Sequence, residues 1–449
     1  VFLAGAMVRR AALSACLALG SHLGVVAAEE GRGLLQCSSD DYLGSIRNSS
    51  AKGMTLDDTT LRYCTSRIPD LWPNSISNIQ SLRMFRSWNR GWEEGLRADA
   101  WDGLVNYAKE NGAKLLLAAP ITCDKEADDL DWIWTKELMR RLGPDHVMGL
   151  AVGNELELLA TTSPITCVRK IWDQGRLWYT FVELVRQIDE MGFGEIPVTT
   201  VFTAGILYEK DSFPFPNIPD KVMALDFFKN ATARYGSRFT FTFNIYPYFD
   251  PDLELDPGSK TECKAAIKKA ICWTGAECLG PSAMMRARER IKALTGVDSR
   301  FWIGEVGWSA PAAITLKPDM QACKEFSSLA TLKAFYQGFL EWDMQLPGQK
   351  PPDHIFYFTL RNALNFGIQE FFGLMFTCKL NECKLKGDDF QATDSLRKPI
   401  DARWLILGFG ALFGSVAVFT IAVAAYVCLT RQKSSRAPSA RFMNDSDEE

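Results

Sequence analysis

The chain has 449 residues, of which 47% are hydrophobic and 23% charged, and its net charge is −4. This balance is typical of a globular core and gives no electrostatic basis for a nucleic-acid partner. Only three histidines are present, which argues against a metal centre with several histidine ligands and against a histidine-based catalytic triad. We therefore expect no bound metal and no cofactor.

The beginning of the chain has the features of a secretory signal peptide. Arg9 and Arg10 precede an apolar run over residues 11–19, and small residues follow that fit a cleavage site. The alternative, a buried helix, fits less well because the apolar run is short. The pattern predicts a signal peptide over residues 1–28, with Glu29 as the first mature residue.

A second apolar segment, residues 404–430, carries no charged residue over 27 positions. At about 1.5 Å per residue it is long enough to cross a hydrocarbon core of ~30 Å. Basic residues follow it, so we expect a single-pass type I protein with a cytoplasmic tail over residues 431–449. A cleaved lipid-anchor signal is the alternative, although such signals end in their hydrophobic stretch. The domain between them, residues 29–403, would be extracellular or lumenal, on the cell membrane or a secretory-pathway membrane.

Ten of the twelve cysteines lie between the two apolar segments. An even number in an exported domain predicts up to five disulfides, although their pairing cannot be deduced from sequence. Cys272 and Cys278, and likewise Cys378 and Cys383, are close enough in sequence to close small loops. N-glycosylation patterns occur at Asn48 and Asn230.

Apolar strand patterns alternate with helical patterns between residues 29 and 403. Strands are predicted at 42–47, 82–85, 114–119, 147–152, 197–202, 239–246, 301–305 and 355–360. Helices are predicted at 99–111, 131–142, 168–191, 221–235, 281–294 and 323–344. Several strands are apolar on both faces, as a parallel sheet covered by helices requires. Because no glycine-rich dinucleotide motif opens the first unit, we predict an α/β fold of the (β/α)8 TIM barrel type.

Carboxylates end two of these strands. The fourth strand ends in Asn154 and Glu155, and the seventh ends in Glu305. On its own, Glu305 fits a surface capping residue equally well, but barrel closure would bring both glutamates over one mouth. Two carboxyl groups about 5–5.5 Å apart characterise a retaining glycosidase, with one as nucleophile and one as acid/base of raised pKa. Glu157, just beyond the fourth strand, is interpreted as a structural or surface group.

Other residues at strand ends have side chains that suit a carbohydrate. Aromatic faces stack on sugars, and an arginine or tyrosine beside the nucleophile would orient it. A chain with 13 Trp and 28 Phe also has aromatic residues near strand ends by chance. The candidate substrate-binding residues are Asn154, Arg83, Trp88, Tyr246, Tyr248 and Trp308.

Four segments in this order, GNE, NIYPYF, GEVGWS and EFFGLMF, resemble family 17 glycoside hydrolases, the β-1,3-glucanases of clan A. The resemblance covers roughly residues 80–378. It implies a (β/α)8 barrel with retaining chemistry, Glu155 as acid/base and Glu305 as nucleophile. It also implies that Asn154 contacts the sugar 2-hydroxyl.

The chain departs from the family pattern near the substrate subsites. Val306 and Ser309 stand where the family has Thr and Pro. The family's acidic residue and Lys after strand eight correspond here to a stretch with Asn362 and Ala363. Glu370 also lies one residue closer to the following Phe-Gly pair. These changes affect the subsites rather than the glutamate pair.

The sequence therefore predicts an enzyme of the glucan endo-1,3-β-glucosidase type, a membrane-anchored retaining hydrolase of O-glycosyl bonds. Its partner would be a β-1,3-glucan of a cell wall or storage material. Three alternatives stay open: a β-1,3-glucan transglycosylase, another barrel β-glycanase that cuts 1,4- or 1,6-linkages, and a catalytically weak surface protein that binds glucan.

Overall fold

The computed structural model describes residues 42–210, 212–218, 222–250, 260–313, 315–363, 370–376, 378 and 383–385. The predicted signal peptide, the apolar segment 404–430, the tail and both ends of the 29–403 domain lie outside these residues. Among the helices that are described, none combines the length and the apolar character needed to cross a membrane.

Eight parallel strands close into a barrel in which each strand pairs with its neighbours in chain order. Because the last strand pairs with the first, the sheet has no free edge. The predicted (β/α)8 architecture is thus confirmed. The barrel strands are β1 (Lys52–Thr55), β2 (Ser81–Arg83), β3 (Lys114–Ala119), β4 (Val147–Asn154), β5 (Val198–Thr203), β8 (Phe241–Asn244), β9 (Phe301–Val306) and β10 (His354–Tyr357).

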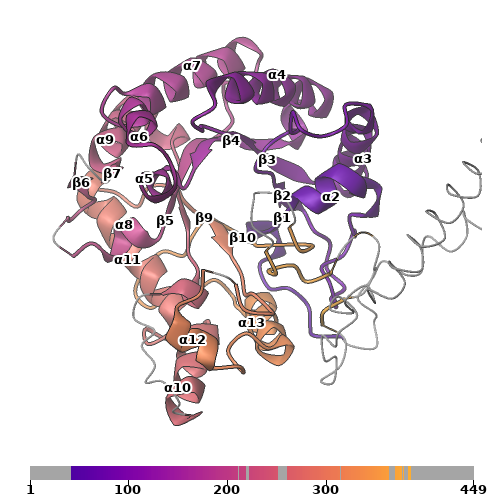
Figure 1. Ribbon diagram of the computed structural model, residues 1–449, viewed down its shortest axis with the longest axis vertical. Helices are drawn as coiled ribbons and strands as arrows, with labels where there is room; N and C mark the ends of the chain where they lie inside the picture. Colours follow the sequence, from indigo (N-terminus) through magenta and orange to yellow (C-terminus); the bar gives the residue numbers. More distant parts are fainter. Residues whose placement is uncertain are drawn as a thin grey trace, which may run out of the picture. The chain divides into compact units, whose positions relative to one another are not determined.

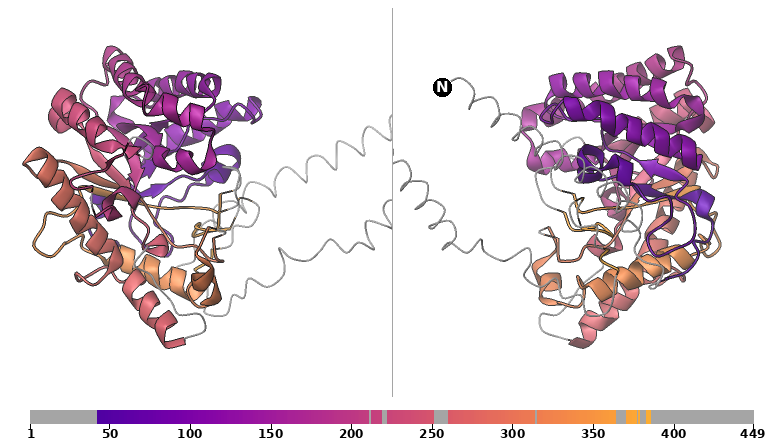
Figure 2. Two further views of the ribbon diagram at one scale, coloured as in Figure 1. Left: turned by 60° about the vertical axis from the view of Figure 1, so that its left-hand side comes forward. Right: turned by 90° about the vertical axis from the view of Figure 1, so that its right-hand side faces the viewer.

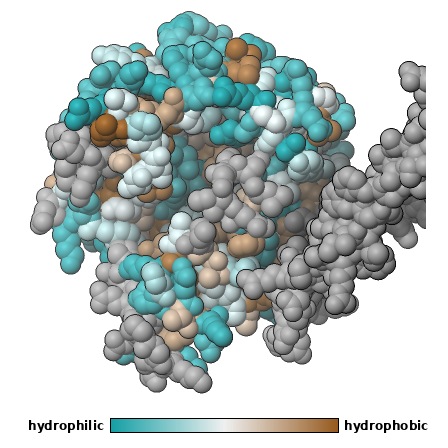
Figure 3. All heavy atoms as spheres, viewed as in Figure 1, coloured by the Kyte–Doolittle hydropathy of each residue, from teal (hydrophilic) through white to brown (hydrophobic). Residues whose placement is uncertain are grey.

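Helices surround the barrel, as Figures 1 and 2 show. The longer ones are α3 (Gly95–Asn111), α4 (Lys125–Leu142), α7 (Arg176–Glu190), α9 (Ala224–Tyr235), α10 (Lys260–Ile271), α11 (Leu279–Thr295) and α13 (Leu329–Glu341). The connections also contain α2 (Asp58–Tyr63), α5 (Leu159–Thr162), α6 (Ile165–Ile171), α8 (Gly205–Tyr208), α12 (Pro318–Ala322) and a hairpin of β6 (Asn217–Ile218) and β7 (Val222–Met223). Over α4 and α7 the outer surface is mostly hydrophilic (Figure 3).

The core has two parts. The larger lies between the strands and the helices, where both have apolar faces. The smaller fills the barrel interior and consists of Leu116, Ala118, Ala151, Val201, Trp302 and Phe356. Packed side chains thus occupy the barrel axis, so a ligand site can form only at an end of the barrel.

The predicted first strand at 42–47 is wrong, because the first strand is β1. Its sequence begins with Lys52, a residue rarely found in a core, yet Lys52 is fully buried. The Lys52 Nζ atom donates hydrogen bonds to the carbonyl oxygens of Phe339 (2.6 Å) and Trp342 (2.5 Å). These carbonyls lie at the C-terminal end of α13, where a cation is favourable. The burial of Lys52 therefore depends on a partner that is distant in sequence.

Two predicted helices are shorter than expected. The pattern over 168–191 is split into α6 and α7, because Gly175 between them adopts a left-handed conformation with φ 72°. The helix predicted at 323–344 begins only at Leu329. There the Ser328 side chain accepts a hydrogen bond from the backbone N–H of Thr331 at 3.2 Å, which caps the helix.

Four disulfides join described cysteines: Cys64–Cys378, Cys123–Cys167, Cys263–Cys323 and Cys272–Cys278. The short Cys272–Cys278 loop matches expectation. The Cys378–Cys383 loop, which the spacing also allowed, does not form, because Cys378 pairs with Cys64. This bond ties the segment after β1 to the segment after β10, across the seam where the barrel closes.

Removing the Cys64–Cys378 disulfide is expected to lower the free energy of unfolding by about 2–5 kcal/mol. The two cysteines are 314 residues apart, so the bond constrains most of the unfolded domain. Denaturant unfolding of the Cys64→Ser/Cys378→Ser variant measures the loss. The matched control is Cys272→Ser/Cys278→Ser, which opens a loop with a separation of only 6 residues. An equal loss in both variants would contradict this view.

Candidate active site

Two glutamates lie at the carboxyl end of the barrel. Glu305 is on β9, and its side chain is 8% exposed. Glu155 directly follows β4 with φ 49° and ψ 42°, a left-handed conformation that is uncommon for residues other than glycine. Gly153 before it also has a positive φ of 79°. Backbone strain of this kind concentrates at functional sites, and here it sets the direction of the Glu155 side chain.

One amide nitrogen links the two carboxylates. Asn244, at the end of β8, pairs in register with Glu305 on β9. Its Nδ2 atom donates to Glu155 Oε1 at 2.8 Å and to Glu305 Oε1 at 2.7 Å. These two oxygens are therefore no more than 5.5 Å apart, the sum of the two lengths. The two carboxyl groups therefore lie close together, which is compatible with the spacing of about 5–5.5 Å in retaining glycosidases.

Further donors hold Glu305. The buried guanidinium of Arg83 forms an ion pair with Glu305, with Nη1 to Oε1 at 3.0 Å. The same nitrogen donates to Asn244 Oδ1 at 3.1 Å, and Nη2 donates to Asn154 Oδ1 at 2.7 Å. The hydroxyl of Tyr246 donates to Glu305 Oε2 at 2.6 Å. Both carboxylate oxygens of Glu305 are thus fixed, as a nucleophile aimed at one carbon atom requires.

Gly304 makes this close packing possible. A Cβ atom at this position would lie 2.6 Å from Asn244 Oδ1 and 2.7 Å from Arg83 Nη1. Both atoms take part in the network around Glu305, so any larger residue would push them away. The glycine before Glu305 is therefore required by the geometry of the site.

The electrostatics of the pair are asymmetric. Burial, and then the neighbouring Glu305 carboxylate, raise the pKa of Glu155 to about 8. At neutral pH Glu155 is therefore mainly protonated. Because Oε1 accepts the Asn244 N–H, the proton of the neutral acid belongs on Oε2, the other oxygen. Glu155 thus has a proton to give, whereas Glu305 forms an ion pair with Arg83.

Replacing Asn244 with alanine is expected to move the alkaline limb of the pH–kcat/KM profile to higher pH. The Asn244 hydrogen bond lowers the pKa of Glu155, so its loss raises this pKa further and keeps the acid protonated at higher pH. We also expect kcat to fall by about 10- to 100-fold, because both carboxyl groups lose a donor. The control is Asn78→Ala, at an exposed position. An alkaline limb that moves to lower pH would contradict the assignment.

Three predicted substrate-binding residues do not reach this site. Trp88, Tyr248 and Trp308 are at most 1% exposed and have no free aromatic face. Trp308 Nε1 donates to the Phe326 carbonyl at 2.7 Å, and the Tyr248 hydroxyl bonds Ser327. These residues lie after strands, as expected, but their rings pack in the core beneath the loops. The prediction that they bind a sugar is therefore corrected.

Two residues of the site were not among the predicted site residues. Asn244 precedes Tyr246 by two positions in NIYPYF. Because alternate residues of a strand lie on the same face, this spacing could have predicted that Asn244 shares the site with Tyr246. Glu370 contributes a third carboxyl group, and burial followed by the charges of Glu305 and Asp58 raises its pKa to about 7. Glu157 accepts a hydrogen bond from the backbone N–H of Thr203, which agrees with a structural role.

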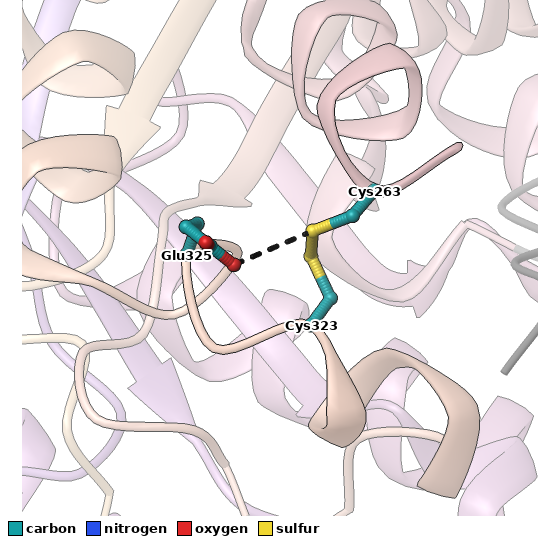
Figure 4. Close-up of side chains that lie close together, drawn as sticks. All are labelled: Cys263, Cys323 and Glu325. Atoms are coloured by element: carbon teal, nitrogen blue, oxygen red, sulfur yellow. Dashed lines mark hydrogen bonds between the residues drawn. A yellow bond between two sulfur atoms is a disulfide. The ribbon is translucent and has the colours of Figure 1, made fainter. Parts of the chain in front are cut away.

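A possible metal cluster proves to be a disulfide. Within the described part of the chain, the one group of ligand-type side chains close enough to share an ion is Cys263, Cys323 and Glu325. Figure 4 shows the two sulfur atoms bonded to each other, with a Glu325 carboxylate oxygen 3.8 Å from Cys263 Sγ. A disulfide offers no thiolate, so this group lacks the ligands of a zinc site.

A prominent surface hollow lies away from the glutamates. Its volume is about 820 Å³, and its lining includes Arg300 and Asp353, which precede β9 and β10. It therefore lies at the amino ends of the strands. Since chemistry in barrels of this type occurs at the carboxyl ends, we assign the active site by side-chain geometry rather than by cavity size.

No protein-family model matches the sequence, and no curated protein does. Solved structures similar in fold include a β-glucosidase from Thermotoga maritima in complex with azafagomine (12% identity, TM-score 0.43, 74% of this chain, 93% of that chain). Another is a β-glucosidase from Exiguobacterium marinum (11%, 0.40, 74% and 93%). A third is β-glucuronidase 2 of Bacteroides uniformis (9%, 0.38, 66% and 29%). At such identities and TM-scores these similarities carry no argument about function, which depends on the geometry above.

Proposed function

We propose that this protein is a retaining glycoside hydrolase that cleaves β-1,3-glucan by double displacement. The observation that carries the proposal is the single nitrogen of Asn244 that binds one oxygen of Glu155 and one of Glu305. This shared donor supports the proposal because a covalent mechanism needs two carboxyl groups close together, one of them protonated.

In the first step, a carboxylate oxygen of Glu305 attacks the anomeric carbon. The bond from this carbon to the leaving oxygen breaks, and that oxygen takes the proton from Glu155 Oε2. The raised pKa of Glu155 supports this role, because the acid must be protonated before the reaction. The products are a glycosyl ester of Glu305 and the shortened glucan.

In the second step, Glu155 acts as a base. It removes a proton from water, the water oxygen attacks the anomeric carbon, and the ester bond to Glu305 breaks. Asn154 Nδ2 has no protein partner among the described residues, so it is free to donate to the 2-hydroxyl of the sugar. A stronger hydrogen bond at this hydroxyl in the transition state would add to the rate.

The choice of β-1,3-glucan depends on the sequence resemblance. The segments GNE, NIYPYF and GEVGWS contain the residues of the hydrogen-bonded network apart from Arg83. The departures from the family pattern at Val306 and Ser309 lie next to this network. The resemblance therefore says less about which glucan linkage is cleaved and about whether water or a sugar is the acceptor. A transglycosylase, with a sugar in place of water, is therefore the second candidate, followed by a 1,4- or 1,6-β-glycanase. A catalytically weak glucan-binding protein is the candidate of another class.

We further propose that the domain is exported and anchored in a membrane. The four disulfides among the described cysteines support an oxidising compartment. The anchor is supported by the uncharged segment 404–430 alone.

The test is to incubate the purified protein with linear β-1,3-, β-1,4- and β-1,6-glucan oligosaccharides and to follow the products by proton NMR. We expect cleavage of the β-1,3 substrate, with the β-anomer formed first. Initial formation of the α-anomer would contradict the retaining mechanism. Cleavage of another linkage alone would contradict the substrate, and longer products at high substrate concentration would indicate transglycosylation.

A further inference from the structure

Arg62, at the end of α2, carries a guanidinium group with no hydrogen-bond or ion-pair partner among the residues that the structure describes. Its Nε atom is shielded from solvent. Two aromatic rings hold it instead. The Arg62 Cζ atom lies 4.7 Å from the ring centroid of Tyr63 and 5.7 Å from that of Trp92. The N–H donors of this guanidinium are thus kept in one place with no acceptor among the described residues.

The ring of Tyr63 is open to solvent. Tyr63 is 55% exposed, whereas Trp92 is 8% exposed and packs edge-on against the buried Trp88, with ring centroids 4.9 Å apart. Trp92 therefore supports Arg62 from the buried side, and Tyr63 lies beside it with more than half of its surface exposed. We call Arg62, Tyr63 and Trp92 the Arg62 strip.

A continuous set of contacts connects this strip to the proposed nucleophile. Tyr246, which donates to Glu305, packs against Phe372 with ring centroids 5.4 Å apart. Two residues earlier, the backbone of Glu370 donates to the carbonyl of Ala363 at 3.1 Å. The preceding Asn362 carbonyl accepts from the Thr59 hydroxyl, at the start of α2, at 3.0 Å. Figure 1 shows α2 beside the ends of β1 and β2.

The spacing along α2 extends this connection. Asp58 lies close enough to Glu370 for its charge to act on it, and Arg62 follows Asp58 by four residues. Residues four apart lie on the same face of a helix. The Arg62 strip therefore lies on the side of Glu370 that is away from Glu305, at the carboxyl end of β1 and β2.

We propose that the Arg62 strip binds a distal glucosyl residue of the chain whose cleavage site lies at Glu155 and Glu305. The exposed part of the Tyr63 ring contacts C–H groups of the pyranose, and the terminal nitrogens of Arg62 donate to its hydroxyl groups. A neutral sugar fits because it offers several acceptors and one apolar face. This inference rests on the proposed function, and it makes the enzyme prefer long chains to short ones.

The test compares kcat/KM for linear β-1,3-glucan oligosaccharides of increasing length, from the disaccharide upward. In Arg62→Ala and in Tyr63→Ala, we expect a loss of about 10-fold or more with the longest substrates and no change with the shortest. The matched control is Tyr179→Ala, which removes a tyrosine that is 70% exposed on α7. The thermal unfolding midpoint of each variant shows whether it is folded.

The results distinguish a failure of the distal subsite from a failure of the proposed glycosidase function. An equal loss at all lengths, or no loss at any length, overturns the distal subsite. A loss seen only with oligosaccharides that carry uronate groups also overturns it, because Arg62 would then bind a charge rather than a neutral sugar. If the unchanged protein does not cleave any glucan and Glu305 is not labelled by a glycosyl fluoride, the proposed function itself fails.

Discussion

Replacing Glu305 with glutamine is expected to lower kcat by about 10⁴-fold or more with every substrate. The glutamine side chain would still fill the space next to Arg83, Asn244 and Tyr246, but an amide is a poor nucleophile. The glycosyl ester then cannot form. Steady-state rates on β-1,3-glucan oligosaccharides and on an aryl β-glucoside measure the loss, which should be similar for the two because both require the same attack.

Two further variants define the role of Glu305. Glu305→Ala with added azide should recover activity on the aryl glucoside and release an α-glycosyl azide, because azide attacks directly from the side that the carboxylate leaves empty. Glu325→Gln, which changes an exposed glutamate, should keep the normal rate. Retention of more than a small fraction of activity by Glu305→Gln would show that another group is the nucleophile.

Replacing Glu155 with glutamine is expected to slow the reaction of natural substrates much more than that of substrates with an activated leaving group. With glucan, kcat should fall by about 10²- to 10⁴-fold, because the leaving oxygen no longer receives a proton. With a dinitrophenyl β-glucoside, whose leaving group needs no proton, formation of the glycosyl-enzyme should stay near its normal rate. Rapid release of dinitrophenol followed by a slow phase, measured by stopped flow, would show this difference.

The pH dependence gives an independent test of the same residue. If Glu155 donates the proton in the first step, as proposed, kcat/KM should fall as the pH rises above about 8, the value to which the pKa of Glu155 is raised. In Glu155→Gln this alkaline limb should disappear, whereas the exposed control Glu195→Gln should keep it. An unchanged alkaline limb in Glu155→Gln would assign the titration to another group.

The sequence contains enough information for the barrel and for the position of both glutamates, for a physical reason. Strands buried on both faces have continuous apolar patterns, and polar residues at their ends are therefore conspicuous. Closure of the barrel then brings Glu155 and Glu305 together without further information. The strand β1 shows the limit of this reasoning, since Lys52 is buried only because the end of α13 receives its amine.

The finer contacts depend on pairings that sequence spacing does not reveal. Asn244 reaches both carboxylates because the register of β8 and β9 sets it opposite Glu305. Trp308 follows Glu305 closely in sequence, yet its ring turns into the core and its Nε1 donates to the Phe326 carbonyl. Arg62 and Trp92 meet only because α2 packs beside the loop after β2. Side-chain direction after a strand end is thus decided by tertiary packing.

The central claim is that Glu305 forms a covalent bond with the sugar, and trapping that bond tests it most directly. The protein is incubated with a 2-deoxy-2-fluoro-β-glucosyl fluoride, which forms the glycosyl-enzyme quickly and hydrolyses slowly. Intact mass spectrometry followed by peptide mapping then locates the label. We predict one label per chain, on Glu305, and none in Glu305→Gln. A label on another residue, or cleavage of glucan with inverted anomeric configuration and no label, would contradict the account.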